Sequence, residues 1–250
     1  MDVVAADLPE LMYAAVASHR RMLGSASRMT DEQYSRQSLL AGWSRGHVLA
    51  HWARNADGQT RMLLAAIRGE LVAQYPGGSA QRQADIEASA ALPARLVLED
   101  VRAAVERVED VWRHMPPDAW PRPTDAHVGT RPAWMSVWAR WRETEIHHVD
   151  LDVGYTHRDW PPEFVDVMLP RVLPTLDDRL TGEVTVQVRV TDRHLVSPHA
   201  AATTADDVIV RGSASALLCW LVGRPIPAAA GLTVRRSGQA WPLPRLRPWA

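Results

Sequence analysis

The sequence predicts one long helix, without an internal breaker, over residues 44–68, SRGHVLAHWARNADGQTRMLLAAIR. Ser44 is a favourable N-cap, because its hydroxyl can accept a hydrogen bond from an unpaired backbone amide of the first turn. His47 and His51 are four residues apart in this helix and therefore share one face. The segment thus predicts a helix that presents a pair of imidazoles on one side.

A second helix with metal-binding residue types is predicted from Pro132, a favourable first-turn residue, to about Asp152. Its centre is RETEIHHVD, residues 142–150, in which Glu143 and His147 are also four residues apart. A carboxylate and an imidazole on one helical face can both reach the same metal ion. A bundle that brings these two helices side by side would bring their donor atoms together.

Further helices are indicated by apolar residues at three- and four-residue spacing, by N-caps and by the turn-forming residues between them. They cover Asp7 to about Gly24, a short segment capped by Thr30 and running through Tyr34, Ser79 to Ser89, and Pro93 to Met115. The stretch from Trp120 to Gly129 is rich in turn-forming residues and is predicted to be irregular. Four long helices joined by modest loops predict an up-and-down four-helix bundle over residues 1–155.

The pattern changes in residues 156–250, which predict a small α+β domain with a mainly antiparallel sheet. Helices are expected over Pro162 to Leu180 and over Ser213 to Leu221, the latter ending at Gly223. Strands are expected over Glu183 to Val190, Val208 to Val210 and Leu232 to Val234. The fold class is therefore a multidomain α+β protein.

Composition excludes several classes of partner. The 250 residues carry a formal net charge of −1 with acidic and basic residues interleaved, so no basic face is expected to bind nucleic acid. The apolar runs are shorter than the roughly 20 residues that span a bilayer, and no stretch has the pattern of a secretion signal. Cys219 is the only cysteine, which fits a reducing cytoplasm, and its apolar surroundings predict a buried side chain. No obligate protein partner is evident.

Two imidazoles and one carboxylate form a set that zinc enzymes use, leaving a fourth position open for water or substrate. The same spacing also arises without a metal. An acid and a histidine four residues apart can be a solvated, helix-stabilising pair, and a single histidine in a bundle can be a hydrogen-bonded interior group. Spacing alone leaves these alternatives open.

Three motifs together resemble the mycothiol-dependent maleylpyruvate isomerase family, whose bundle belongs to the DinB-like metal-dependent group. They are GWSRGHVLAH at residues 42–51, Arg142-Glu143, and IHHVDL at residues 146–151. Residues 212–224 and the tryptophan-containing C-terminus resemble the second domain of the family, so the similarity covers nearly the whole chain.

The resemblance implies that His51, Glu143 and His147 bind zinc or another divalent metal. It also implies mycothiol, a cysteine-bearing sugar thiol of actinobacteria, as the thiol cosubstrate. His47 and His148 are left over and are expected to pack or to support the ligands. For Asp150 two roles stay open, orienting an imidazole or being a solvated acid at the helix end.

The family's reaction implies a cationic site. A thiolate adds to the cis double bond of maleylpyruvate, and rotation about the resulting single bond followed by loss of the thiol gives fumarylpyruvate. Such a dicarboxylate needs cationic anchors, and Arg82 and Arg224 match family positions with that suggested role. Arg224 would reach in from the second domain, placing the site between domains. The alternative for each is a surface arginine or, for Arg224, a helix C-cap.

Other functions are compatible with the same motifs. An S-transferase would use the activated thiol to conjugate other electrophiles, in detoxification or in natural-product biosynthesis. A non-catalytic module would bind the metal or ligand without turnover, and a purely structural role would leave the histidines buried without a metal.

Overall fold

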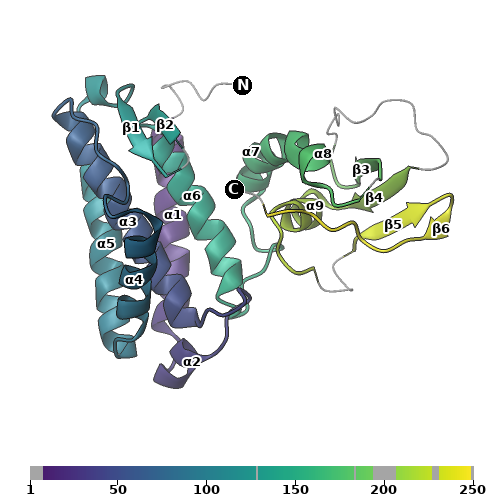
Figure 1. Cartoon of the computed structure of the whole chain (residues 1–250), viewed down its shortest axis with the longest axis horizontal. Coiled ribbons are helices and arrows are strands. Elements are labelled where there is room, and N and C mark those ends of the chain that lie inside the picture. Colours follow the sequence, from purple (N-terminus) through teal and green to yellow (C-terminus); the bar gives the residue numbers. More distant parts are fainter. Residues whose placement is uncertain (1–7, 128, 183, 194–206, 227–230, 249–250) are drawn as a thin grey trace. The chain divides into compact units, whose positions relative to one another are not determined.

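The N-terminal part of the chain is a helical bundle (Figure 1). The computed structural model describes residues 8–127, 129–182, 184–193, 207–226 and 231–248. The chain divides into two compact units, and the first ends at Gly154 and the second begins at Tyr155. Four long helices build the first unit: α1 (Leu8–Ser27), α3 (Arg45–Ile67), α5 (Ala94–His114) and α6 (Met135–Asp150). Helix α3 packs against both α5 and α6, and α1 packs against α6 and α5. The long helices predicted from the sequence are thus present.

Two helix starts follow the predicted capping. Thr30 caps α2 (Asp31–Ser35) in a capping box with Gln33, and Ser44 caps α3 in a capping box with His47. The short helix α4 (Gly78–Ala90) lies along α3. These caps fix where α3 begins and therefore where its histidines fall.

The loop before α4 packs closely against α3 at a glycine. A Cβ atom built at Gly58 would lie 2.8 Å from Cγ of Gln74 and 3.0 Å from its carbonyl oxygen. Only a residue without a side chain therefore lets this loop approach, and the loop carries Tyr75 to the same side of α3 as His51.

A hairpin corrects the prediction for residues 120–129. After a 3₁₀ turn (Pro117–Ala119), the stretch expected to be irregular contains β1 (Pro123–Ala126), which pairs antiparallel with β2 (Gly129–Pro132). Pro132 ends β2, so α6 begins at Met135 and not at Pro132 as predicted. Tertiary hydrogen bonds hold this short hairpin: Gln74 N donates to Asp125 O at 2.9 Å, and Arg122 Nη1 donates to the last carbonyls of α3.

The second unit is an α+β domain with a small mixed sheet, mostly antiparallel. The strands lie in the order β3 (Val186–Val190), β4 (Val208–Gly212), β5 (Thr233–Arg236) and β6 (Gln239–Ala240), with only the β3–β4 pair parallel. Helix α9 (Ala214–Leu221), capped by Ser213, packs on β3, β4 and α7. Cys219 is buried there, as predicted.

One predicted helix of the second unit is divided in the structure. The expected helix from Pro162 to Leu180 consists of α7 (Pro162–Val172), a 3₁₀ turn (Leu173–Thr175) and α8 (Leu176–Arg179). Proline in a helix interior removes a backbone donor and crowds the preceding turn, and Pro170 and Pro174 both lie in this segment. The strand predicted from Glu183 begins at Val186, and residue 183 lies outside the described residues. No helix in the described part of the chain has the length and apolarity of a membrane span.

Substitution of two helix glycines tests the close packing at α3. Gly58→Ala is expected to destabilise the protein, because overpacking of about 1–3 kcal/mol outweighs the gain of about 0.5–1 kcal/mol from replacing a helical glycine. Gly24→Ala in α1 is the matched control, because the nearest atom to its new Cβ is Arg28 Nη1 at 3.5 Å. It should stabilise slightly. Denaturant unfolding measures both changes, and a stabilised Gly58→Ala protein would contradict the packing of Gln74 on α3.

Candidate metal centre

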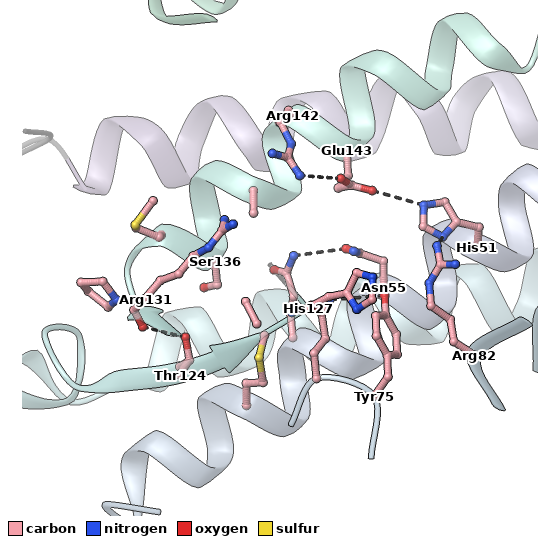
Figure 2. Close-up of a pocket in the computed structure, with 17 residues that line it drawn as sticks. His51, Asn55, Tyr75, Arg82, Thr124, His127, Arg131, Ser136, Arg142 and Glu143 are labelled. Atoms are coloured by element: carbon pink, nitrogen blue, oxygen red, sulfur yellow. Dashed lines mark hydrogen bonds and ion pairs between the residues drawn. The ribbon is translucent and has the colours of Figure 1, made fainter. Parts of the chain in front are cut away.

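Three donor atoms from α3 and α6 converge on one point. His51 Nε2 lies 3.1 Å from His147 Nε2 and 3.2 Å from Glu143 Oε2, and His147 Nε2 lies 3.4 Å from Glu143 Oε2. Figure 2 shows His51 and Glu143 facing each other across the space between the two helices. Ligand distances of about 2.0–2.2 Å to a tetrahedral ion separate neighbouring donors by about 3.3 Å. This triangle therefore fits one divalent cation.

Buried hydrogen bonds between α3 and α6 hold this triangle. Trp52 Nε1 donates to Thr144 Oγ1 at 3.0 Å, and these residues are the immediate neighbours of His51 and Glu143 in sequence. Arg140, which is fully buried, donates through Nη1 to Trp52 O at 3.0 Å. The relative position of the two helices is thus set by contacts next to the donors.

Burial and mutual contacts shift the pKa of each of the three residues. Burial lowers the pKa of His51 to about 4, against the opposing effect of Glu143. Burial alone would raise the pKa of Glu143, but its hydrogen bonds with His147 and His51 and the charge of Arg142 hold that pKa well below its usual value. Burial also opposes protonation of His147, but Asp150 and Glu143 outweigh it and raise the pKa of His147. His51 and Glu143 therefore have the charge states that metal binding requires, neutral imidazole and carboxylate.

Asp150 fixes the orientation of one imidazole. It is fully buried, and its Oδ2 lies 2.8 Å from His147 Nδ1. A carboxylate there holds the proton on Nδ1 and leaves the Nε2 lone pair facing the triangle. Of the two roles left open for Asp150, the structure supports the orienting one.

Arg82 contacts Nδ1 of the other imidazole, that of His51, and this contact places the proton of His51 on Nε2. Arg82 Nη2 lies 2.8 Å from His51 Nδ1, and a guanidinium can only donate. A neutral His51 that accepts this bond carries its proton on Nε2, where it faces Glu143. Coordination through Nε2 requires the other tautomer, so a metal on His51 and this hydrogen bond from Arg82 exclude each other.

The leftover histidines lie outside the triangle. His47 Nδ1 lies 2.7 Å from Ser44 Oγ and its Nε2 lies 3.0 Å from Glu87, so it belongs to the helix cap. His148 is buried, with Nε2 2.8 Å from Ser25 Oγ. His148 is packed in the interior, as expected from the sequence, whereas His47 belongs to the N-terminal cap of α3.

Two members of the triangle, His51 and Glu143, line a pocket within the first unit (Figure 2). The predicted anchor Arg82 lines it, with its guanidinium 5.4 Å from the centre of the Tyr75 ring. Arg224 belongs to the second unit, where its Nη1 donates to Val222 O at 2.9 Å near the end of α9. Its role as an anchor stays a prediction.

Several lining residues were missed by the sequence analysis. Tyr75 comes from the loop before α4, His127 from the hairpin connection, Arg131 from β2, and Gln59 from α3. Gln59 lies eight residues after His51 and could have been placed on the same helix face by spacing. No sequence signal marks Arg131, because its placement depends on the unpredicted hairpin.

Comparisons with known proteins cover nearly the whole chain. A family model described as mycothiol maleylpyruvate isomerase N-terminal domain matches residues 15–152, and one described as MDMPI C-terminal domain matches residues 159–242. Two similar crystal structures, each with a TM-score of 0.84 and covering 97% of both chains, are the mycothiol-dependent maleylpyruvate isomerase, at 25% sequence identity, and a histidine-to-alanine mutant of such an isomerase, at 24%. No curated protein matches the chain.

Removal of the Asp150 charge tests whether the triangle is an oriented metal site. Asp150→Asn is expected to weaken zinc binding about 10- to 100-fold, as loss of a residue that orients a ligating histidine does. Competition with a chromophoric chelator measures the affinity. Glu87→Gln is the control, because Glu87 contacts His47 and none of the three donors, and it should bind zinc like the wild type. Equal affinities of Asp150→Asn and wild type would contradict the orienting role.

Proposed function

Because the chain belongs to the mycothiol maleylpyruvate isomerase family, we propose that it is a metal- and mycothiol-dependent enzyme that activates a thiol for addition to an electrophile. The most specific form of this proposal is cis–trans isomerisation of maleylpyruvate to fumarylpyruvate. Its main support is the His51–Glu143–His147 triangle opening into a pocket, in a chain 25% identical over its length to a mycothiol-dependent maleylpyruvate isomerase.

His51, Glu143 and His147 are the proposed ligands of a zinc ion. When bound, zinc leaves a coordination position open and supplies a thiol in its deprotonated form at neutral pH. The protein's own contribution is to hold the three donors in place before binding, through the Trp52–Thr144 hydrogen bond, and to keep the proton of His147 on Nδ1 through Asp150.

The proposed isomerisation needs little proton transfer from the protein. A bond forms between the thiolate sulfur and one alkene carbon, and the alkene electron pair moves into the conjugated carbonyl as an enolate. Rotation about the carbon–carbon single bond follows. The electron pair then returns, the carbon–sulfur bond breaks, and the trans alkene and the thiolate are released. The chain's task is to bind and orient the electrophile while this occurs.

Arg82 is proposed to bind a carboxylate of the electrophile. It lines the pocket beside His51, and coordination of a metal through His51 Nε2 would free its guanidinium from Nδ1. Arg224 remains proposed as a second anchor, on the family resemblance alone. An S-transferase would use the same thiol site with other electrophiles and would not require both arginines.

Metal analysis and turnover test the proposed ligands. The purified protein is expected to bind about one zinc ion per chain and to isomerise maleylpyruvate only with mycothiol present. His51→Ala should lose both zinc and turnover, because it removes one of three donors. His47→Ala is the matched control on the same helix, since His47 contacts Ser44 and Glu87, and it should keep both. Full zinc content and turnover in His51→Ala would overturn the site.

The choice of electrophile separates the alternatives. Arg82→Ala is expected to abolish turnover of the diacid and to spare a neutral electrophile. An enzyme that conjugates neutral electrophiles and leaves maleylpyruvate unchanged would be an S-transferase. Zinc binding without turnover of the diacid or of the neutral electrophile would indicate a non-catalytic binding module.

A further inference from the structure

Arg131 stands at the end of the pocket away from the metal triangle. Figure 2 shows Arg131 beside Ser136 and Thr124 at one end, with His51 and Arg82 at the other. The hairpin fixes its backbone, because Arg131 is paired with Thr124 in the β1–β2 register and its carbonyl accepts a hydrogen bond from Thr124 Oγ1 at 2.9 Å. The base of the Arg131 side chain is therefore held in a defined place.

The charge of Arg131 is not balanced by an acidic side chain. Three arginines and one glutamate line the pocket, and Glu143 already contacts Arg142 through Oε1 at 2.9 Å and both imidazoles through Oε2. Across the residues that the structure describes, no carboxylate forms an ion pair with Arg131. Burial and the positive charge of Arg142 both lower the pKa of Arg131. A half-buried guanidinium next to a like charge favours binding of an anion.

Two residues that line the same pocket carry a buried polar atom without a hydrogen-bond partner among the described residues. They are Ser136 Oγ and Gln59 Oε1, on side chains that are 7% and 2% exposed. The orientation of Gln59 follows from its neighbours: Arg140 donates to Asn55 Oδ1, so Gln59 must donate to the same oxygen through Nε2 and leave Oε1 as an acceptor. Unpaired buried groups of this kind are costly unless a ligand or water satisfies them. The Ser136 hydroxyl can donate to an anion, whereas Gln59 Oε1 can only accept and needs a donor such as water.

We propose that Arg131, with the hydroxyl of Ser136, binds a carboxylate of the electrophile at the hairpin end of the pocket, and that Arg131 thereby determines specificity for anionic electrophiles. The specificity role of Arg131 rests on the proposed function, whereas the binding of an anion by Arg131 does not depend on it. A guanidinium matches a carboxylate with two parallel hydrogen bonds, and the serine hydroxyl adds a third donor. With Arg82 at the metal end, the pocket has a cation at each end, which suits an electrophile with two separated carboxylates.

The first test measures anion binding without any reaction. Succinate is the probe, since it carries two carboxylates and no double bond, and calorimetry measures its binding to the wild-type protein. Arg131→Gln is expected to weaken this binding about 10- to 100-fold, as expected for loss of hydrogen bonds to a charged group. Arg131→Lys should bind with intermediate affinity, because it keeps the charge but not the paired hydrogen bonds. Arg95→Gln, which removes an exposed arginine of α5, should bind like the wild type.

The second test uses steady-state kinetics with mycothiol. Arg131→Gln should raise the KM for maleylpyruvate while the KM for mycothiol, the zinc content and the thermal unfolding midpoint stay unchanged. Isomerisation of dimethyl maleate, an uncharged cis alkene, should be the same in Arg131→Gln and wild type. An unchanged KM for maleylpyruvate, or an equal loss with the uncharged alkene, would overturn the specificity role.

The two tests separate this inference from the proposed function. An inactive wild-type protein whose succinate binding is lost in Arg131→Gln would refute the isomerase and support the anion site. A wild-type protein that does not bind succinate, or binds it equally well after Arg131→Gln, would overturn the anion site whatever the enzyme's activity.

Discussion

The site depends on how α3 and α6 are fixed to each other. The Trp52–Thr144 hydrogen bond and the Arg140 bond to the Trp52 carbonyl are buried. Trp52 and Thr144 are adjacent to His51 and Glu143 in sequence, and Arg140 lies three residues before Glu143. Arg140 also lies 5.0 Å from the Trp52 ring centre, and burial lowers its pKa to about 10. A fully buried guanidinium is costly unless its contacts are kept. The two helices can therefore not slide past each other without losing several buried polar contacts at once, and the donor triangle inherits this rigidity.

Because the two helices are fixed, the three donor atoms cannot move apart, and shared protons alone stabilise the triangle poorly. Two imidazole nitrogens and a carboxylate oxygen lie within 3.4 Å of one another, with little room for the three groups to relax. Without a cation, His51 is a neutral tautomer that accepts from Arg82 and donates towards Glu143. A divalent ion bound there would replace the shared protons with one charge that suits all three donors. Because Arg82 Nη2 contacts His51 Nδ1, binding of a metal through His51 Nε2 would free the guanidinium that is proposed to anchor a carboxylate.

Sequence reasoning found the parts of the site that follow local rules. Ser44 and Thr30 placed two helix starts, and four-residue spacing put Glu143 and His147 on one face. That spacing could not show that Asp150 is buried against His147, because a helix-end acid is solvated or buried according to its tertiary neighbours. The hairpin escaped prediction for a related reason. Its strands are four residues long and are held by contacts with Gln74 and the end of α3, so neither alternation nor propensity marks them. Because the hairpin was not predicted, Arg131 was not recognised as a residue of the pocket.

The two ends of the pocket are therefore formed by two kinds of structure. The donors and their supports come from long helices whose relative position is fixed by buried contacts, so the reactive end tolerates little change. The opposite end comes from a short hairpin attached at its margins, with Arg131 on β2 and Ser136 in the first turn of α6. The buried hydrogen bonds that join α3 to α6, from Trp52 to Thr144 and from Arg140 to Trp52 O and Asn55 Oδ1, do not involve the strand that carries Arg131. The motifs that carry the family resemblance contain the three donors, whereas Arg82 and Arg131, the proposed contacts of the electrophile, lie outside those motifs.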